Sequence, residues 1–245
     1  MSRNIPRLYV DAPLRENGAL SLGRDHAHYL RDVMRLKPGD DLLVFNGRDG
    51  EWRCALSQLD RKRADGATLE QTRPQTAATG PDLFFAPVKK TGTGFIAEKA
   101  TELGVQALRP VMTEYTDTSR VNIGRLRANA IEAAEQCGRL DVPDIHEPVP
   151  LLGLAETWPS SRILVIADET GQGAGVLDVL RSVDSTAAPP AFVIGPQGGF
   201  SETELVFLRG LPFVKTVDLG PRILRAETAA VSVLTCWQAV RGDWT

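Results

Sequence analysis

The sequence has 245 residues, of which 42% are apolar and 24% are charged, and its formal net charge is −3. This length is enough for one large domain or for two smaller ones, and the composition excludes a disordered chain. The small negative charge excludes a surface that is basic throughout but leaves room for a local basic patch.

The first 74 residues have the pattern of a small β-rich domain. Strands are predicted in "RLYV" from Arg7, in "DDLLVFNG" and in "EWRCALSQL", with turn signals "KPGDD" and "NGRDGE" between them. This segment carries 13 Lys and Arg against 11 Asp and Glu, a slight positive excess. One short helix is predicted in "DHAHYLRDVMR", where Arg31 and Arg35 stand four residues apart and would share a helix face.

The amino terminus, "MSRNIPRLYV", lacks the apolar core of a secretory signal, and the longest apolar runs, such as "ILVIA", are far shorter than a membrane span of about 20 residues. We therefore expect a cytoplasmic protein with no membrane contact. Cys54, Cys137 and Cys236 are isolated, and the histidines of "HAH" are wrongly spaced to ligate one metal from a helix face. These patterns predict no disulfide and no metal.

A linker is predicted in "TRPQTAATGP", which is rich in Thr, Pro, Ala and Gly and has no periodicity. We place the domain boundary there, with one domain at 1–74 and a second at 75–245. After it, strand-like and helix-like segments alternate, from "DLFFAPV" and "GFIAEKATELG" to "VKTVDLG" and "AETAAVSVLTCWQAV". Such alternation predicts an α/β fold, a mostly parallel sheet with helices on both faces.

Three loops follow the last three predicted strands: "ADETGQG", "GPQGG" and "LGPRILRAETA". Ligands of open α/β sheets bind beyond the carboxyl ends of the strands, so these loops predict a binding site. A helix is predicted to begin at Ser201, with Glu204 completing a capping box and Phe200 packing on Leu205. The first strand of this domain is not followed by G-x-G-x-x-G, and the chain has no P-loop, which disfavours a nucleotide-dependent oxidoreductase.

Four spaced segments resemble one family, the RsmE-type ribosomal RNA uridine-N3 methyltransferases of the SPOUT class. They are "HAHYLRDVMRLKPGD", "EKATELGVQALRPV", "AIEAAEQCGRLDVP", and the pair "IGPQGGFSETE" and "LGPRILRAETAA", so that the resemblance covers nearly the whole chain. It implies a PUA-like front domain that docks RNA, followed by a trefoil-knotted SPOUT domain.

The resemblance also implies S-adenosylmethionine as methyl donor and a homodimer with each donor site near the subunit interface. The implied substrate is one uridine of small-subunit (16S) ribosomal RNA, free or in the assembled small ribosomal subunit, methylated at ring nitrogen N3. Two alternatives stay open: a SPOUT enzyme that acts on transfer RNA or on a ribose 2′-hydroxyl, and a non-catalytic RNA-binding assembly factor.

The resemblance and the loop pattern together give a set of expected donor-binding residues: Ile194, Gly195, Pro196, Gly198, Gly199, Leu219, Gly220, Ile223, Leu224 and Arg225. Their backbone amides and carbonyls would read adenine and ribose, and the apolar side chains would pack on them. Gln197 stands where the family usually has Glu, so a carboxylate is missing from this loop.

Uridine N3 carries a proton that must leave before methyl transfer, so the site needs a base or a group that stabilises the uridine anion. The expected catalytic residues are Arg225, to hold the anionic O2 or O4 edge or a phosphate, and Glu227, to accept the proton or to orient Arg225. A first-turn carboxylate that complements the helix dipole is the alternative role for Glu227. The expected RNA contacts are Arg7, Arg31, Arg35, Lys89, Lys90 and Arg139.

Overall fold

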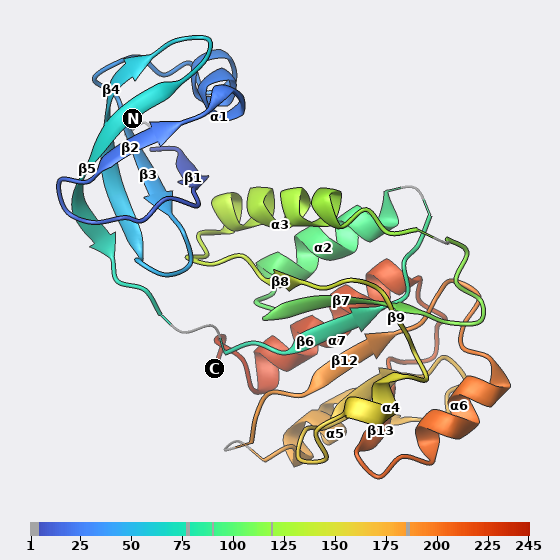
Figure 1. Cartoon of the computed structure of the whole chain (residues 1–245). Helices are drawn as coiled ribbons and strands as arrows, with labels where there is room; N and C mark the ends of the chain where they lie inside the picture. Colours follow the sequence, from blue (N-terminus) through green and yellow to red (C-terminus); the bar gives the residue numbers. More distant parts are fainter. Residues whose placement is uncertain (1–4, 77–78, 90, 119, 185–186) are drawn as a thin grey trace. The chain divides into compact units, whose positions relative to one another are not determined.

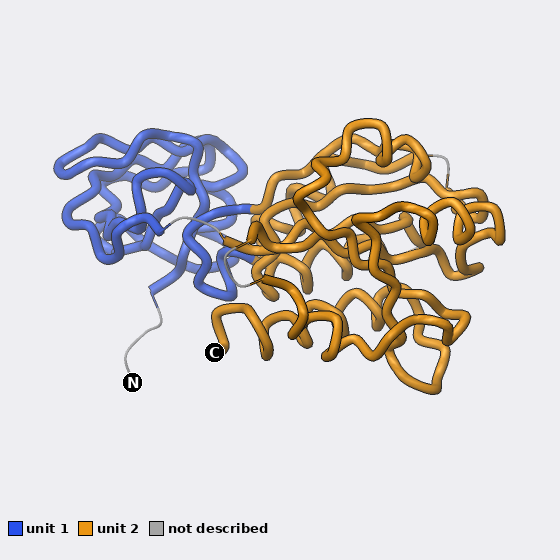
Figure 2. Tube along the Cα trace, turned by 90° about the horizontal axis from the view of Figure 1, so that it is seen from below, with its two compact units in different colours: residues 1–77, 134–142 blue, residues 78–133, 143–245 orange. Residues whose placement is uncertain are grey.

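The structure is a computed structural model that describes residues 5–76, 79–89, 91–118, 120–184 and 187–245. The chain divides into two compact units (Figure 2). Unit 1 contains residues 1–77 and 134–142, and unit 2 contains residues 78–133 and 143–245.

Unit 1 is built on a five-stranded sheet (Figure 1). Its strands are β1 (Arg7–Tyr9), β2 (Ala19–Leu22), β3 (Asp41–Phe45), β4 (Glu51–Leu59) and β5 (Ala64–Arg73), in the order β1-β3-β4-β5-β2. Strand β1 runs parallel to β3, and the other neighbours are antiparallel. The buried leucines of this unit, such as Leu30 and Leu42, form one apolar cluster of their own.

The helix of unit 1 is not a regular α-helix. Helix α1 (Arg24–His28) continues as a π-helical turn, η1 (Tyr29–Val33), and Arg35 beyond it has a positive φ of 57°. The prediction that Arg31 and Arg35 share one face of a regular helix is therefore wrong. A π turn has about one residue more than an α turn, so side chains four apart no longer align.

Unit 2 contains an eight-stranded sheet in which all the recorded pairings are parallel. Along the sheet the strands follow the order β11-β13-β10-β12-β6-β7-β8, and β9 also pairs with β7. The strands are β6 (Asp82–Phe85), β7 (Ala107–Met112), β8 (Asp144–Ile145), β9 (Val149–Pro150), β10 (Leu164–Ala167), β11 (Ala174–Gly175), β12 (Ala191–Ile194) and β13 (Val214–Asp218). Because the sheet is parallel, its central strands are buried on both faces, as the near-continuous apolar runs of β10 and β12 require.

Helices cover both faces of this sheet. Phe85 and Phe192 point to the face that α2, α3, α5 and α7 cover, whereas Phe84 and Val193, one residue away along their strands, point to the face of α4 and α6. The helices are α2 (Gly92–Glu102), α3 (Ile123–Cys137), α4 (Leu154–Thr157), α5 (Val176–Ser182), α6 (Glu202–Arg209) and α7 (Ala226–Val240).

The predicted strands and helices of both units are confirmed to within a few residues, and so is the capping box of Ser201 and Glu204 at α6. Strands β2 and β5, the two-residue strands and α4 were not predicted. In the part of the chain that the structure describes, no helix combines the length and apolar character needed to cross a membrane. The same residues hold no group of three or more His, Cys, Asp or Glu side chains that could bind a metal ion.

Candidate functional site

The loops after β10, β12 and β13 enclose a cavity of about 320 Å³, which we call the three-loop cavity. A volume of this size lies at the lower end of the range for small-molecule sites. Its lining residues are 167–171, 194–197, 199, 218–224, 226 and 229. The sequence therefore predicted correctly that the three strand ends converge.

Glycines shape the middle loop of this cavity. Gly199 has a φ of +77°, and a β-carbon there would collide with Oε1 of Glu169. A β-carbon at Gly195 would lie 2.9 Å from the ring of Phe200. Both positions thus require glycine, because backbone conformation or close packing leaves no room for a side chain.

Carboxylates give the cavity a negative lining. The lining includes Asp168, Glu169 and Asp218, against one cation, Arg222. Because Asp168 is paired with Arg209, the charge excess comes from Glu169 and Asp218. Glu169 Oε1 accepts a hydrogen bond from the backbone N–H of Phe200 at 2.8 Å, and Asp218 Oδ1 accepts one from the N–H of Gly220 at 2.8 Å. The acidic lining favours a ligand that carries positive charge.

Asp168 connects the cavity to helix α6. Its side chain is fully buried, and its Oδ2 forms an ion pair with the guanidinium of Arg209. Burial by itself raises the pKa of Asp168, but hydrogen bonds from Thr170 and Arg209 outweigh burial and hold the pKa below its ordinary value. Asp168 is therefore an ionised structural anchor.

A second hollow, of about 680 Å³, adjoins the three-loop cavity, and we call it the Arg225 hollow. It is lined by Lys89, Thr91, Gly92, Gln197, Ile223, Leu224, Arg225 and Glu227. Gln197, Ile223 and Leu224 line both spaces, so the two hollows meet along these residues.

Glu227 lies where helices α7 and α2 both begin. A β-carbon at Gly92, the first residue of α2, would lie 2.8 Å from Glu227 Oε1, so the missing side chain makes room for the carboxylate. Glu227 Oε2 is buried and has no hydrogen-bond partner among the described residues. Arg225 is the exposed N-cap residue of α7, two positions before it.

The structure brings the expected donor-binding residues together in the three-loop cavity, except for two. Gly198 does not line it, since a β-carbon at Gly198 would point to Tyr115, and Arg225 lines the second hollow instead. Sequence reasoning named the "ADETGQG" loop but none of its residues, and so missed Asp168, Glu169 and Thr170. Carboxylates directly after a predicted strand were the available signal.

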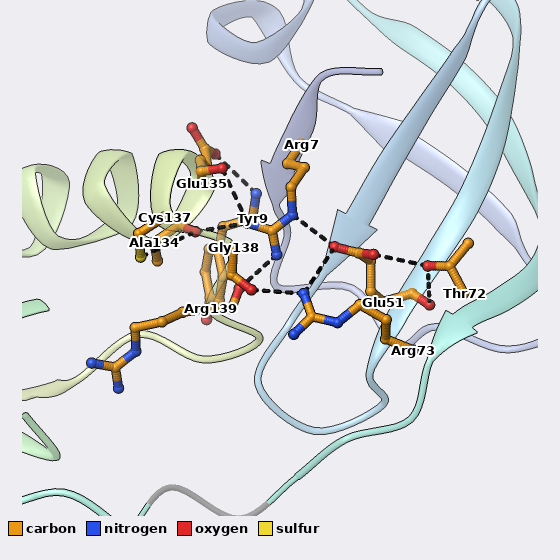
Figure 3. A network of polar contacts seen from close by, with 10 residues as sticks. All are labelled: Arg7, Tyr9, Glu51, Thr72, Arg73, Ala134, Glu135, Cys137, Gly138 and Arg139. Carbon is orange, nitrogen blue, oxygen red and sulfur yellow. Dashed lines mark hydrogen bonds and ion pairs between the residues drawn. The ribbon is translucent and has the colours of Figure 1, made fainter. Parts of the chain in front are cut away.

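Arg7 has internal partners that account for its guanidinium (Figure 3). It pairs with Glu51 at 2.7 Å and donates to the carbonyl oxygens of Ala134, Glu135 and Arg139 at 2.6–3.0 Å. Its side chain is only 13% exposed and lies over the ring of Phe45. The expectation of an RNA contact at Arg7 needs correction, because Arg7 holds the end of α3 inside unit 1.

The guanidinium of Arg139 is likewise 13% exposed and pairs with Asp141 at 3.0 Å, which corrects the expectation that it contacts RNA. Arg31 pairs with Asp32 at 2.6 Å but stays at the surface, and Arg35 is exposed. Lys89 is exposed, with Asp117 3.2 Å away, and Lys90 lies outside the described residues.

Comparison with known proteins gives this geometry a family. Residues 78–238 match the RNA methyltransferase domain family, and residues 22–68 match the RNA methyltransferase PUA domain family. Ribosomal RNA small subunit methyltransferase E of Rickettsia conorii is 30% identical over 230 residues, which cover 93% of each chain. The chain belongs to the ribosomal RNA small subunit methyltransferase E family.

Solved structures of similar proteins have the same fold. The enzyme of Neisseria gonorrhoeae, bound to S-adenosyl methionine, superimposes with a TM-score of 0.87 at 25% identity over 99% of this chain and 100% of its own. A putative methyltransferase of Legionella pneumophila, in complex with the same cofactor, gives 0.86 at 24% identity over 97% and 98%. Unit 1 thus contains the PUA domain, and unit 2 contains most of the RNA methyltransferase domain.

Proposed function

We propose that this chain transfers a methyl group from S-adenosylmethionine to N3 of one uridine in small-subunit ribosomal RNA. The observation that carries the proposal is that the three-loop cavity and the Arg225 hollow meet at Gln197, Ile223 and Leu224. S-adenosylmethionine in the three-loop cavity and the target uracil in the Arg225 hollow would face each other at this junction, as methyl transfer requires.

The three-loop cavity fits the donor in shape and charge. Its required glycines let a ligand approach the backbone, and Ile194, Leu224 and Ala229 provide apolar surface. S-adenosylmethionine supplies an electrophilic methyl group on a positively charged sulfur, and the cavity's carboxylates favour a cationic ligand. A solved methyltransferase E and a second protein of the same fold, both bound to this cofactor, support the assignment.

The Arg225 hollow has the two groups that methylation of uracil N3 needs, a proton acceptor and a cation that stabilises the uracil anion. Glu227 Oε2 has no partner among the described residues and would take the proton from uracil N3. The negative charge left on the ring would be stabilised by the guanidinium of Arg225 at O2 or O4. Packing holds Glu227 in position for this proton transfer, because Gly92 leaves room for its carboxylate.

We further propose that the chain acts as a homodimer, that unit 1 docks the RNA through phosphate contacts of Arg31 and Arg35, and that Lys89 of unit 2 is a further phosphate contact. These side chains remain at the surface, and family resemblance supports the arrangement. Phosphate contacts position an RNA without reading its sequence.

The test is product analysis with two matched variants. Small-subunit RNA, transfer RNA and assembled small subunits, each lacking the modification, are incubated with the purified protein and labelled S-adenosylmethionine, and nucleosides are identified by mass spectrometry. We expect N3-methyluridine from the small-subunit substrates only. Glu227→Gln should lose on the order of 100-fold in rate, and Glu202→Gln, an exposed first-turn carboxylate of α6, should not.

Each other outcome contradicts a separate part of the proposal. Label in transfer RNA or in a ribose 2′-hydroxyl would assign the chain to a different substrate class. Donor binding without any product would indicate an assembly factor. Full activity of Glu227→Gln, with only a small loss of stability, would reduce Glu227 to a partner of the helix dipole.

A further inference from the structure

A groove of about 510 Å³ lies between the first turns of α2 and α3, and we call it the Phe95 groove. It shares no residue with the three-loop cavity, but it shares Lys89 and Thr91 with the Arg225 hollow. Its lining residues are Pro87, Val88, Lys89, Thr91, Thr93, Gly94, Phe95, Glu98, Thr118, Arg120, Val121, Asn122, Arg125, Leu126 and Asn129. The groove therefore continues the proposed acceptor site along the surface of unit 2.

An aromatic ring and several cations line this groove. Phe95 is 43% exposed, although it stands on a helix whose other apolar residues, such as Ile96, are buried. Arg120 and Arg125 are exposed, and neither forms an ion pair with another described residue. The single carboxylate of the lining, Glu98, is paired with Lys99 at 2.7 Å, so the groove has a net positive charge.

A side-chain amide is also held in the groove. A β-carbon at Gly94 would collide with Nδ2 of Asn129, so that the absence of a side chain lets the amide cross the first turn of α2. Glycine inside a helix costs about 1 kcal/mol relative to alanine. The helix thus tolerates an unfavourable residue at the position where Asn129 needs space.

We propose that the Phe95 groove holds the nucleotide next to the target uridine in a single-stranded stretch of the RNA. The base of that nucleotide stacks on Phe95, its phosphate lies against Arg120 and Arg125, and Asn129 donates to or accepts from its edge. This inference rests on the proposed function, because it places the neighbour of a uridine that occupies the Arg225 hollow.

The chemistry of the groove favours RNA over a protein partner. Stacked aromatics beside cations are how proteins bind unpaired bases, at about 1–3 kcal/mol per stacked base. An enzyme that acts on a base edge must also take the base out of a helix, which leaves its neighbour available for stacking. The two unpaired arginines match the phosphates of such a strand.

The experiment uses the full chain and a fluorescent 12-nucleotide RNA with one central uridine. Dissociation constants are measured over a series of salt concentrations, with intact RNA and with RNA lacking the base on either side of the uridine. We expect Phe95→Leu to weaken binding about tenfold, whereas Phe95→Trp, which keeps a stacking face, should bind as the wild type does. Arg125→Ala should reduce the salt slope by about 0.7.

Removal of the neighbouring base should weaken the wild type and leave Phe95→Leu unchanged, because that variant has already lost the stacking contact. Phe207→Leu, an apolar change on α6 at a ring that is 38% exposed, and Lys215→Ala serve as controls and should have no effect. All variants should bind S-adenosylmethionine with the affinity of the wild type, which would show that they are folded.

Equal binding by Phe95→Leu and wild type, or equal loss on the abasic RNA, would overturn the inference. A change in sedimentation of Phe95→Leu would instead assign the groove to a protein contact. The outcome is separate from that of the proposed function. If the wild type fails to methylate but the RNA effects appear, the function is wrong and the groove stands; if it methylates and the variants bind normally, the groove assignment is wrong.

Discussion

Asp168 and Glu169 are neighbours in the sequence and line the same cavity, yet they hold different parts of it. Asp168 is fully buried and pairs with Arg209 of α6, whereas Glu169 accepts from the backbone of Phe200 in the loop before that helix. Both therefore fix the loop after β10 to the β12–α6 unit. This arrangement keeps the walls of the three-loop cavity in place.

Replacement of Asp168 by Asn tests its anchoring role through pH. Because the pKa of Asp168 lies below its ordinary value, its stabilisation is fully present above the unfolded pKa of about 3.9 and is lost as pH falls through the folded pKa. We expect Asp168→Asn to cost about 2 kcal/mol at pH 7, as the loss of hydrogen bonds to a charged group does, with the difference narrowing below about pH 4. Urea unfolding at several pH values measures it, and a pH-independent difference would contradict the ionised pair.

Arg225 lies outside the three-loop cavity, and this position separates donor binding from catalysis. We expect Arg225→Ala to bind S-adenosylmethionine normally and to lose on the order of 100-fold in kcat, as removal of a charge-stabilising donor typically does. Arg225→Lys should restore little, since an ammonium cannot reproduce the guanidinium fork. Turnover near wild type at saturating RNA would remove Arg225 from the mechanism.

Among the elements, those with a strong local pattern were predictable from the sequence, and those that depend on distant partners were not. Strands β10 and β12 are continuous apolar runs, and α6 carries its own capping box, so both types of signal lie within a few residues. Strand β5 reads as "ADGATLEQTR", a mixed sequence that is strand only because β4 and β2 pair with it.

The candidate site and its surroundings were also only partly predictable from the sequence. The three loops were predictable because parallel strands end at one edge of a sheet. That Arg7 reaches the carbonyls of Ala134 and Glu135, 127 and 128 residues away, has no local signal. Arg7 lies in a strand of a domain with a slight excess of positive charge, so the sequence favoured an RNA contact. Only the tertiary packing shows that Arg7 stabilises the end of α3.

The carboxyl end of α3 therefore gives a prediction at this scale. Arg7→Lys keeps the charge but loses most of the fork that joins Glu51 to three carbonyl groups of residues 134–139. We expect a loss of about 2 kcal/mol in the free energy of unfolding, measured by urea denaturation, with little change in RNA affinity. Arg24→Lys, at an exposed position of α1, is the control. Equal stability of both variants, together with weaker RNA binding by Arg7→Lys, would instead assign Arg7 to the RNA-binding surface.

At the scale of the whole methyltransferase domain, the proposed function depends on three hollows that adjoin one another. The three-loop cavity meets the Arg225 hollow at Gln197, Ile223 and Leu224, and the Arg225 hollow meets the Phe95 groove at Lys89 and Thr91. Donor, target base and neighbouring nucleotide would then occupy one continuous path. The two glycines at the start of α2, Gly92 and Gly94, open two of these three spaces to side chains from other helices.

The proposed homodimer concerns the loop that lies at the first of these junctions. Ile223 is 88% exposed beside the three-loop cavity, although a large apolar side chain gains about 1.5–3 kcal/mol from burial. If a second protomer covers this loop, Ile223→Asp should weaken self-association and affinity for S-adenosylmethionine together. Val206→Asp, at a 66% exposed position of α6, should change neither. Sedimentation equilibrium and calorimetric titration of the full chain measure the two quantities. A wild-type chain that remains monomeric at tens of micromolar while binding the donor fully would show that each protomer completes its own site. Because Ile223 also lines the donor cavity, the deciding measurement is on the wild type: a donor affinity that falls on dilution, as the dimer dissociates, would show that the partner completes the site.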